Sequence, residues 1–314
     1  MKCKLAVAAL VLLSLCVPAA AVEDPSCRNV RFADVGWSDI AATTGLASAV
    51  LEGLGYKPGV TFASVPVALT GLKNRQIDVF LGYWDPVMTP LVEPFVKAGH
   101  IQVLAQPNLV GARHSLAVPQ YLYDRGLKDF SDISRFQKEL QGKIFGIESG
   151  SDGNTQIQAM IRENRFGLQN FQLVASSEAG MLAEVQQAVS ARKAIVFLGW
   201  EPHPMNNRVK LRYLTGGDDV FGANLGAASV YTAVPSAFEA RCPNVAAFLN
   251  QLQFTTDIES QVMGLIQDEA KPTVAARNFL RKNPALLERW LRGVTTFDGR
   301  DGLAAVTAFI KRPG

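Results

Sequence analysis

Short apolar runs alternate with amphipathic, helix-like segments along this chain, and the alternation begins a second time near Ser115. Strands are predicted over 29–35, 60–65 and 77–81 and, in the second series, over 115–118, 143–147, 171–174 and 195–198. Thr43 and Thr44 are predicted to cap the helix that ends near Gly53. Repeated strand–helix–strand units predict an α/β fold with helices on both faces of its sheets.

Two such series without a flexible linker indicate paired lobes, and 314 residues suit two cores better than one. The chain is predicted to cross between the lobes near 111–113 and again near 223–227. We therefore expect a bilobed binding-protein fold with a double-crossover hinge, in which lobe I comprises 22–112 and 227–314 and lobe II comprises 113–226. A cleft between lobes is a common place for a ligand.

The first 21 residues have the pattern of a secretory signal peptide. Lys2 and Lys4 precede an apolar run over 5–17, and small residues follow up to Ala21, where cleavage is expected. The run is too short to span a bilayer as a helix. An alternative is lipid attachment at Cys16, although the large Leu15 before it is unfavourable. The product is expected to be exported to the periplasm.

Cysteine usage agrees with export. Cys3 and Cys16 would leave with the signal peptide, so Cys27 and Cys242 remain in the mature chain. Two cysteines in an oxidising compartment most simply form a disulfide, which would place both ends of the chain in lobe I. The alternative is two unrelated free thiols.

Several classes of function lack support in the sequence. Lys and Arg total 31 against 28 Asp and Glu, so no strong positive field is available to gather nucleic acid. The glycine-rich segment 149–153 lacks the lysine of a phosphate loop, and the three histidines are not spaced as metal ligands. We expect no cofactor, no metal and no nucleic-acid partner.

Three of the four tryptophans have similar surroundings. Trp37, Trp84 and Trp200 each follow a short predicted strand and a nearby glycine. The crevice beyond the carboxyl ends of strands is where open α/β sheets bind ligands. Several ring faces around one small volume bind an organic cation, because each face is electronegative. The alternative is three tryptophans that only pack in the core.

The motifs around these tryptophans resemble the choline-binding branch of the periplasmic substrate-binding proteins, which serve ABC importers of glycine betaine, choline and carnitine. The motifs are Gly36-Trp37-Ser38-Asp39-Ile40, Gly82-Tyr83-Trp84-Asp85-Pro86 and Gly199-Trp200-Glu201-Pro202-His203-Pro204-Met205-Asn206. The resemblance covers essentially the whole mature chain. It implies closure of two lobes over one ligand, and a box of three Trp and one Tyr. It also implies an Asp that meets the ligand hydroxyl and an Asn from lobe II. By position, Trp37, Trp84, Trp200 and Asp39 carry over.

Two positions depart from that pattern. His114 stands where the family has the Tyr, with Arg113 beside it, and Ser151 stands where the family has the Asn. The segment from Ser151 to Asn154 precedes a predicted helix, whose N-terminus favours a negative group. These changes lead us to expect a ligand with a carboxylate, carnitine, ahead of choline or glycine betaine. A solvent-facing histidine at a domain boundary remains the alternative for His114.

The sequence thus predicts the substrate-binding component of an ABC importer, with a small quaternary ammonium ligand and an inner-membrane ABC permease as its partners. The chain is not expected to be an enzyme. The alternative from another class is an exported hydrolase of choline esters. That activity would need a nucleophilic serine with a histidine in reach, and no motif supports such a pair.

Overall fold

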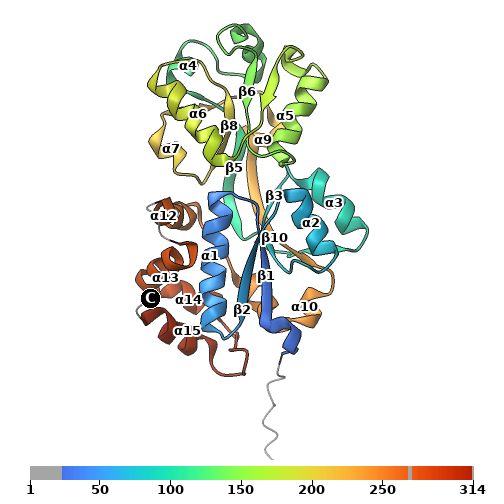
Figure 1. The fold of residues 1–314 in the computed structure, drawn as a ribbon, viewed down its shortest axis with the longest axis vertical. Coiled ribbons are helices and arrows are strands. Elements are labelled where there is room, and N and C mark those ends of the chain that lie inside the picture. The colour runs from blue at the N-terminus through green and yellow to red at the C-terminus, as the bar shows by residue number, and fades with distance from the viewer. Residues whose placement is uncertain (1–22, 268–270, 313–314) are drawn as a thin grey trace, which may run out of the picture.

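Two long strands, β5 (Leu109–Pro119) and β10 (Ala227–Pro235), join two α/β lobes in the computed structural model, which describes residues 23–267 and 271–312. The lobes lie one above the other along the long axis of the molecule (Figure 1). The predicted signal peptide and Cys16 lie outside the described residues. No helix within the described ranges is long and apolar enough to cross a membrane.

The strands of lobe I bring Trp84 to the boundary between the lobes. β1 (Asn29–Asp34) pairs in parallel with β2 (Lys57–Phe62), and Phe32 bridges to Val79, just before β3 (Phe80–Asp85). β3 and β4 (Ile101–Val103) both pair antiparallel with β10. β2 was predicted over 60–65 but lies earlier in the chain, because its register follows β1 from the pair Asn29 and Lys57.

Among the helices of lobe I, α1 (Ser38–Gly53) is buried over most of its length. The others are η1 (Pro25–Arg28), α2 (Val65–Lys73), α3 (Thr89–Lys97), α10 (Phe238–Arg241), α11 (Pro243–Gln251), α12 (Thr256–Gln267), α13 (Pro272–Lys282), α14 (Ala285–Trp290) and α15 (Gly302–Lys311). α1 begins at Ser38, so the predicted cap at Thr43 and Thr44 is wrong. The Thr43 hydroxyl instead donates to the Asp39 carbonyl within the helix, 3.0 Å away.

Lobe II is built on the strand order β5, β8 (Phe197–Glu201), β6 (Lys143–Phe145) and β7 (Gln172–Val174), with β9 (Leu211–Tyr213) beside β5. Its helices are α4 (Gln120–Asp124), η2 (Phe130–Phe136), α5 (Asp152–Arg162), η3 (Arg165–Gly167), α6 (Glu178–Ser190), α7 (Met205–Arg208), α8 (Asp218–Phe221) and α9 (Ala223–Gly226). The parallel pairing of β7, β6 and β8 agrees with the predicted α/β units.

The two long strands pass between the lobes at neighbouring points and join strands of both lobes in one sheet. β10 pairs with β5 at Ala227 and Arg113, and Arg113 also pairs with Glu201 of β8 in lobe II. Beyond these pairs, β10 continues along β3 and β4 in lobe I. The fold is therefore bilobed with two crossovers, as expected. The residue limits assigned to each lobe stay a prediction.

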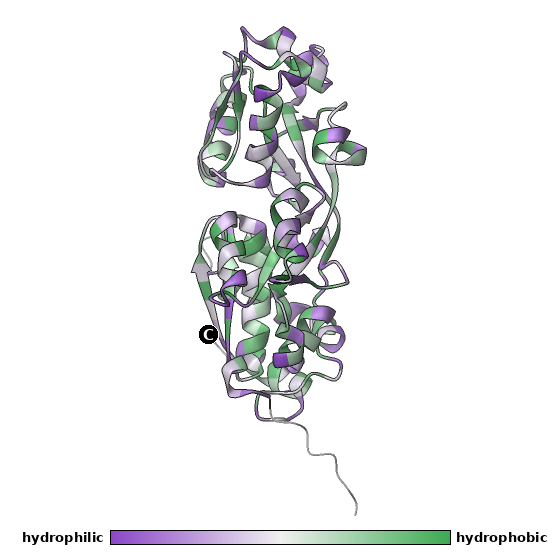
Figure 2. Ribbon diagram, turned by 90° about the vertical axis from the view of Figure 1, so that its right-hand side faces the viewer, coloured by the Kyte–Doolittle hydropathy of each residue, from purple (hydrophilic) through white to green (hydrophobic). Residues whose placement is uncertain are grey.

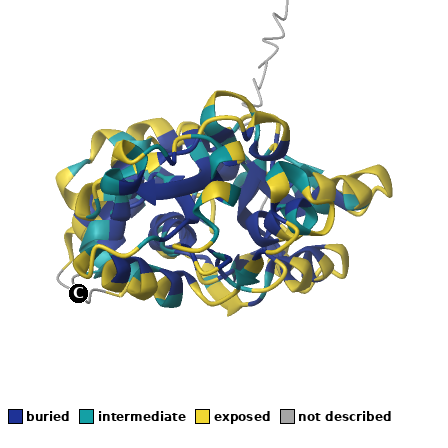
Figure 3. Cartoon of the chain, turned by 90° about the horizontal axis from the view of Figure 1, so that it is seen from above, coloured by how far each residue is buried: buried dark blue, intermediate teal, exposed yellow. Residues whose placement is uncertain are grey.

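Both lobes bury apolar side chains between strands and helices. Figure 2 shows hydrophobic residues along the strands, and the view from above shows buried residues at the centre and exposed residues at the rim (Figure 3). A disulfide joins Cys27 to Cys242, with 5.5 Å between their Cα atoms, so the predicted bridge is confirmed. Since α12, α13 and α15 pack with α1, the residues at both ends of the described chain lie in lobe I (Figure 1).

Candidate ligand-binding site

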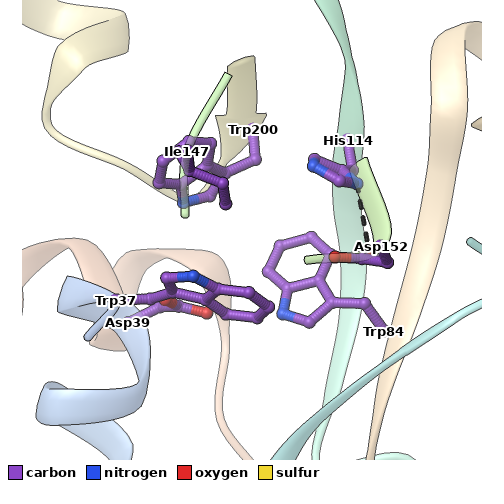
Figure 4. Close-up of a pocket in the computed structure, with 7 residues that line it drawn as sticks. All are labelled: Trp37, Asp39, Trp84, His114, Ile147, Asp152 and Trp200. Carbon is purple, nitrogen blue, oxygen red and sulfur yellow. Dashed lines mark ion pairs between the residues drawn. The ribbon is translucent and has the colours of Figure 1, made fainter. Parts of the chain in front are cut away.

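A small cavity lies between the lobes. Side chains from both lobes line it, and Figure 4 shows them approaching from opposite sides. The lining consists of Trp37, Asp39 and Trp84 from lobe I with His114, Ile147, Asp152 and Trp200 from lobe II and its crossover strand. Five of the eight residues that the sequence nominated for the ligand therefore meet in one place.

The three indole rings are held by regular structure. Trp37 is the N-cap residue of α1, while Trp84 and Trp200 are the penultimate residues of β3 and β8. Loops after the strands were expected for all three, but pairing of Trp84 with Val230 and of Trp200 with His114 extends both strands through the tryptophans. Each of the three residues is at most 6% exposed, so packing restricts the positions of the rings around the cavity.

Asp39 brings a carboxyl group into the same cavity from the first turn of α1. The residue is 3% exposed, and its Oδ1 has no hydrogen-bond partner. Burial, and then the nearby carboxylate of Glu178, raise the pKa of Asp39 to about 8. An unpaired buried carboxylate is unfavourable, so this position is well suited to a positively charged or hydrogen-donating ligand.

His114 forms part of the wall and is not a solvent-facing residue. Its ring centroid lies 5.9 Å from that of Trp84 and 5.7 Å from that of Phe221. A Cβ on Gly153 would lie 2.9 Å from its Cε1, so the glycine permits this close packing. Burial lowers the pKa of His114 to about 4, which leaves the ring neutral at neutral pH. His114 therefore contributes an uncharged ring to the box.

Arg113, the neighbour of His114, does not line the cavity. Successive side chains of a strand point to opposite faces, and the Arg113 guanidinium instead lies 5.3 Å from the ring centroid of Tyr213. The expected cation beside the ligand is thus directed away from it, because it shares strand β5 with His114.

Ser151 and Asn154 shape the cavity indirectly. Ser151 is fully buried as the N-cap of α5, where its hydroxyl accepts from the Asn154 backbone N–H. The Asn154 side chain accepts from the Ile147 N–H and donates to the carbonyls of Ile147 and Glu148. These bonds fix the loop that presents Ile147 to the cavity. Neither polar side chain is part of the lining.

Asp152 and Ile147 are the lining residues that the sequence analysis missed. Asp152 is the first residue of α5 and is 2% exposed, and burial raises the pKa of its carboxyl to about 6. Its position directly after Ser151, in a segment already singled out, was a usable signal. Ile147 ends an apolar run, and nothing in that pattern distinguishes it from an ordinary core residue.

Two glutamates of lobe II bind the N-terminus of α1 across the boundary between the lobes. The Trp37 indole N–H donates to both carboxylate oxygens of Glu148, at 3.0 and 3.1 Å. The Ser38 backbone N–H donates to Glu178 Oε2 at 3.0 Å. The other oxygen of Glu178 lies 3.1 Å from His203 Nε2, and His203 Nδ1 accepts from a backbone N–H. These contacts hold the lobes together and close the cavity.

The chemistry of the cavity favours an organic cation. Its lining combines three indole faces with two carboxyl groups and contains no lysine or arginine. Ring faces attract a quaternary ammonium without requiring hydrogen bonds from it, and the carboxylates supply the opposite charge. No serine or cysteine is among the residues that line the cavity. The alternative function, hydrolysis of choline esters, therefore has no nucleophilic side chain there.

A family profile described as the substrate-binding domain of an ABC-type glycine betaine transport system matches residues 28–282. The chain belongs to this family. Its members are extracytoplasmic substrate-binding proteins of transport systems and are not enzymes, which confirms the resemblance noted in the sequence.

Solved structures of the family allow a closer comparison. An ABC-transporter choline-binding protein in complex with choline is 48% identical, covers 92% of this chain and 100% of its own, and superposes with a TM-score of 0.90. An ABC-transporter choline-binding protein in an unliganded semi-closed conformation is also 48% identical. The match covers 91% of this chain and 100% of that protein, and the two superpose with a TM-score of 0.83.

A curated relative is more distant. The glycine betaine/carnitine transport binding protein of Listeria monocytogenes is 28% identical over 162 residues, which span 52% of this chain and 53% of that protein.

Proposed function

We propose that this protein captures a quaternary ammonium compound for an ABC importer and that choline is its preferred ligand. The observation that carries the proposal is the convergence of Trp37, Trp84 and Trp200, from both lobes, on one cavity into which Asp39 brings a carboxyl oxygen without a hydrogen-bond partner. The trimethylammonium group would lie against the ring faces, each contributing about 0.5–2 kcal/mol. The Asp39 carboxylate would accept a hydrogen bond from the ligand hydroxyl and balance the positive charge of the ammonium group.

Closure is the second part of this function. The hydrogen bonds that Trp37 and Ser38 donate to Glu148 and Glu178 form only when the lobes meet, so the closed form excludes water from the cation. Exclusion of water strengthens the attraction between the cation and the carboxylates. The closed surface would then differ from the open one, which allows a permease to distinguish the loaded protein.

Two observations favour choline over the carnitine expected from the sequence. The expectation relied on a positive charge near the ligand carboxylate, but Arg113 is directed towards Tyr213 and the neutral ring of His114 carries no charge. The relative that superposes at a TM-score of 0.90 was solved with choline. Carnitine remains an untested prediction, and the experiment below includes it.

The partner and the location follow from the same proposal. The mature protein would start after a signal peptide cleaved near Ala21 and would act in the periplasm. It would deliver its ligand to an inner-membrane ABC permease.

Calorimetric titration of the purified mature protein with choline, carnitine and glycine betaine tests the proposal directly. We expect choline to bind most tightly, with quenching or a shift of tryptophan fluorescence on binding. Tighter binding of carnitine would restore the interpretation drawn from His114 and Ser151. Absence of heat and of any fluorescence change with all three compounds would refute quaternary ammonium binding.

A further inference from the structure

Asp152 is a buried carboxylate whose role in the choice of ligand has not been assigned so far. It lines the cavity from the start of α5, and neither of its oxygens has a hydrogen-bond partner. His114 Nδ1 lies 3.8 Å from Asp152 Oδ2, beyond hydrogen-bonding distance. Figure 4 shows the carboxyl group beside Trp84, next to His114.

The position of Asp152 has no sufficient explanation in the stability of α5. The Ser151 hydroxyl already caps this helix through the Asn154 N–H. The backbone N–H groups of Asp152 and Gly153 favour the carboxylate form, but burial outweighs them and raises the pKa. A solvated acid at this helix position would gain the same dipole interaction at no desolvation cost. The side chain therefore carries a cost that a ligand in the cavity would offset.

The two acids approach the cavity from different lobes. Asp39 belongs to α1 of lobe I, whereas Asp152 belongs to α5 of lobe II, so both surround the ligand only after closure. A single trimethylammonium group is attracted by both. A carboxylate on the ligand would instead meet a like charge, and juxtaposed like charges in a desolvated site are strongly unfavourable.

We propose that Asp152 is a specificity-determining residue that excludes ligands carrying a carboxylate and restricts this site to quaternary ammonium compounds without an anionic group. This inference rests on the proposed function. It assigns rejection of glycine betaine and carnitine to one side chain, whereas the aromatic box binds the ammonium group that all three compounds share.

The test is the isosteric change Asp152→Asn, with calorimetric titration of choline, glycine betaine and carnitine at one pH near 8. The dissociation constant of glycine betaine divided by that of choline should fall at least about tenfold. The dissociation constant of carnitine divided by that of choline should fall as well. Asp124→Asn removes the same charge from an exposed site in lobe II and should leave both ratios unchanged. Asp152→Ser, measured in parallel, should change the ratios in the same direction.

The outcomes separate the inference from the function on which it rests. A helix-stabilising role alone would lower the thermal unfolding temperature of Asp152→Asn and leave the ligand ratios within twofold of wild type, which would overturn the inference. Wild-type protein that bound glycine betaine or carnitine more tightly than choline would overturn it too, while quaternary ammonium binding stood. Wild-type protein that bound none of the three would refute the proposed function itself.

Discussion

Asp39 shows at the scale of one residue how the site is prepared for a cation. Its carboxyl is buried and faces the carboxylates of Glu178 and Glu259, both close enough to interact with it. Burial and then the charge of Asp39 also raise the pKa of Glu259 well above its ordinary value. Neutral carboxyl groups thus stabilise the closed form without ligand, whereas a bound cation favours the charged form of Asp39.

This competition predicts a pH dependence of ligand affinity. Without ligand, the closed form holds the pKa of Asp39 at about 8, above its ordinary value, so protonation favours that form as the pH falls below 8. Choline carries the same charge throughout and prefers the carboxylate. Its affinity should therefore decrease from pH 8 to pH 6, by at most about tenfold per pH unit for one proton. Asp152, with its pKa raised to about 6, acts in the same direction.

Calorimetry in two buffers of different ionisation enthalpy checks this prediction, because proton release on binding makes the observed heat depend on the buffer. The Asp39→Asn variant should bind more weakly and lose most of the dependence above pH 7. Equal affinity of the wild type at pH 6 and pH 8 would contradict the assignment.

The tryptophans allow a matched comparison of binding and stability. Trp200→Leu removes one ring face and should weaken choline binding about 2- to 30-fold, according to the energy of one cation–π contact. Trp290 is also fully buried, but it packs in lobe I and donates to the Gln253 carbonyl. Trp290→Leu should lower the free energy of unfolding by about 2–5 kcal/mol and leave affinity nearly unchanged. Titration and denaturant unfolding of both variants measure the two effects.

At the scale of the element, α1 connects binding to closure. Asp39, in its first turn, lines the cavity. At the helix N-terminus, the Ser38 backbone N–H donates a hydrogen bond to the Glu178 carboxylate. A carboxylate at a helix N-terminus is favourable because the first backbone N–H groups lack partners within the helix. Lobe II thus completes the cap of a lobe I helix when the lobes close.

Removal of that carboxylate should shift the molecule towards the open form. Glu178→Ala loses a hydrogen bond to a charged group, worth about 1.5–3 kcal/mol, so choline affinity should fall about tenfold or more. Small-angle scattering should show a larger radius of gyration for the variant without ligand. Glu184→Ala, on the exposed side of the same helix, is the control and should change neither quantity. An unaltered affinity in Glu178→Ala would show that this contact does not stabilise closure.

At the scale of the whole molecule, two crossover strands and one disulfide organise the lobes. The bridge between Cys27 and Cys242 spans 215 residues of chain and encloses all of lobe II, although both cysteines lie in lobe I. Both side chains are almost completely buried. The bridge therefore restrains the unfolded chain as a whole and lies away from the cavity between the lobes.

Loss of the bridge should affect stability and not ligand choice. Replacement of both cysteines by serine should lower the free energy of unfolding by about 2–5 kcal/mol, while choline affinity at 15 °C should stay within about twofold of wild type. Denaturant unfolding and calorimetry provide the two measurements. In addition, oxidised mature protein should show no reactive thiol when unfolded. Two titratable thiols would contradict the bridge.

The sequence by itself determined the alternation of strands and helices, the disulfide partners and the residue types of an aromatic box. Those features depend on local periodicity and on the few cysteines and Gly-Trp pairs, all visible without contacts. The preference for carnitine did not follow from the same information. It depended on where Arg113 and Ser151 point.

Only the tertiary structure decided those directions. Arg113 faces away because it alternates with His114 on β5, and Ser151 is engaged as a helix cap. Asp152 became part of the site because α5 starts at the closed boundary, next to rings from lobe I. Whether a side chain lines a cavity depends on strand register, helix start and lobe closure. These are set by packing between segments far apart in the chain, so no local pattern specifies them.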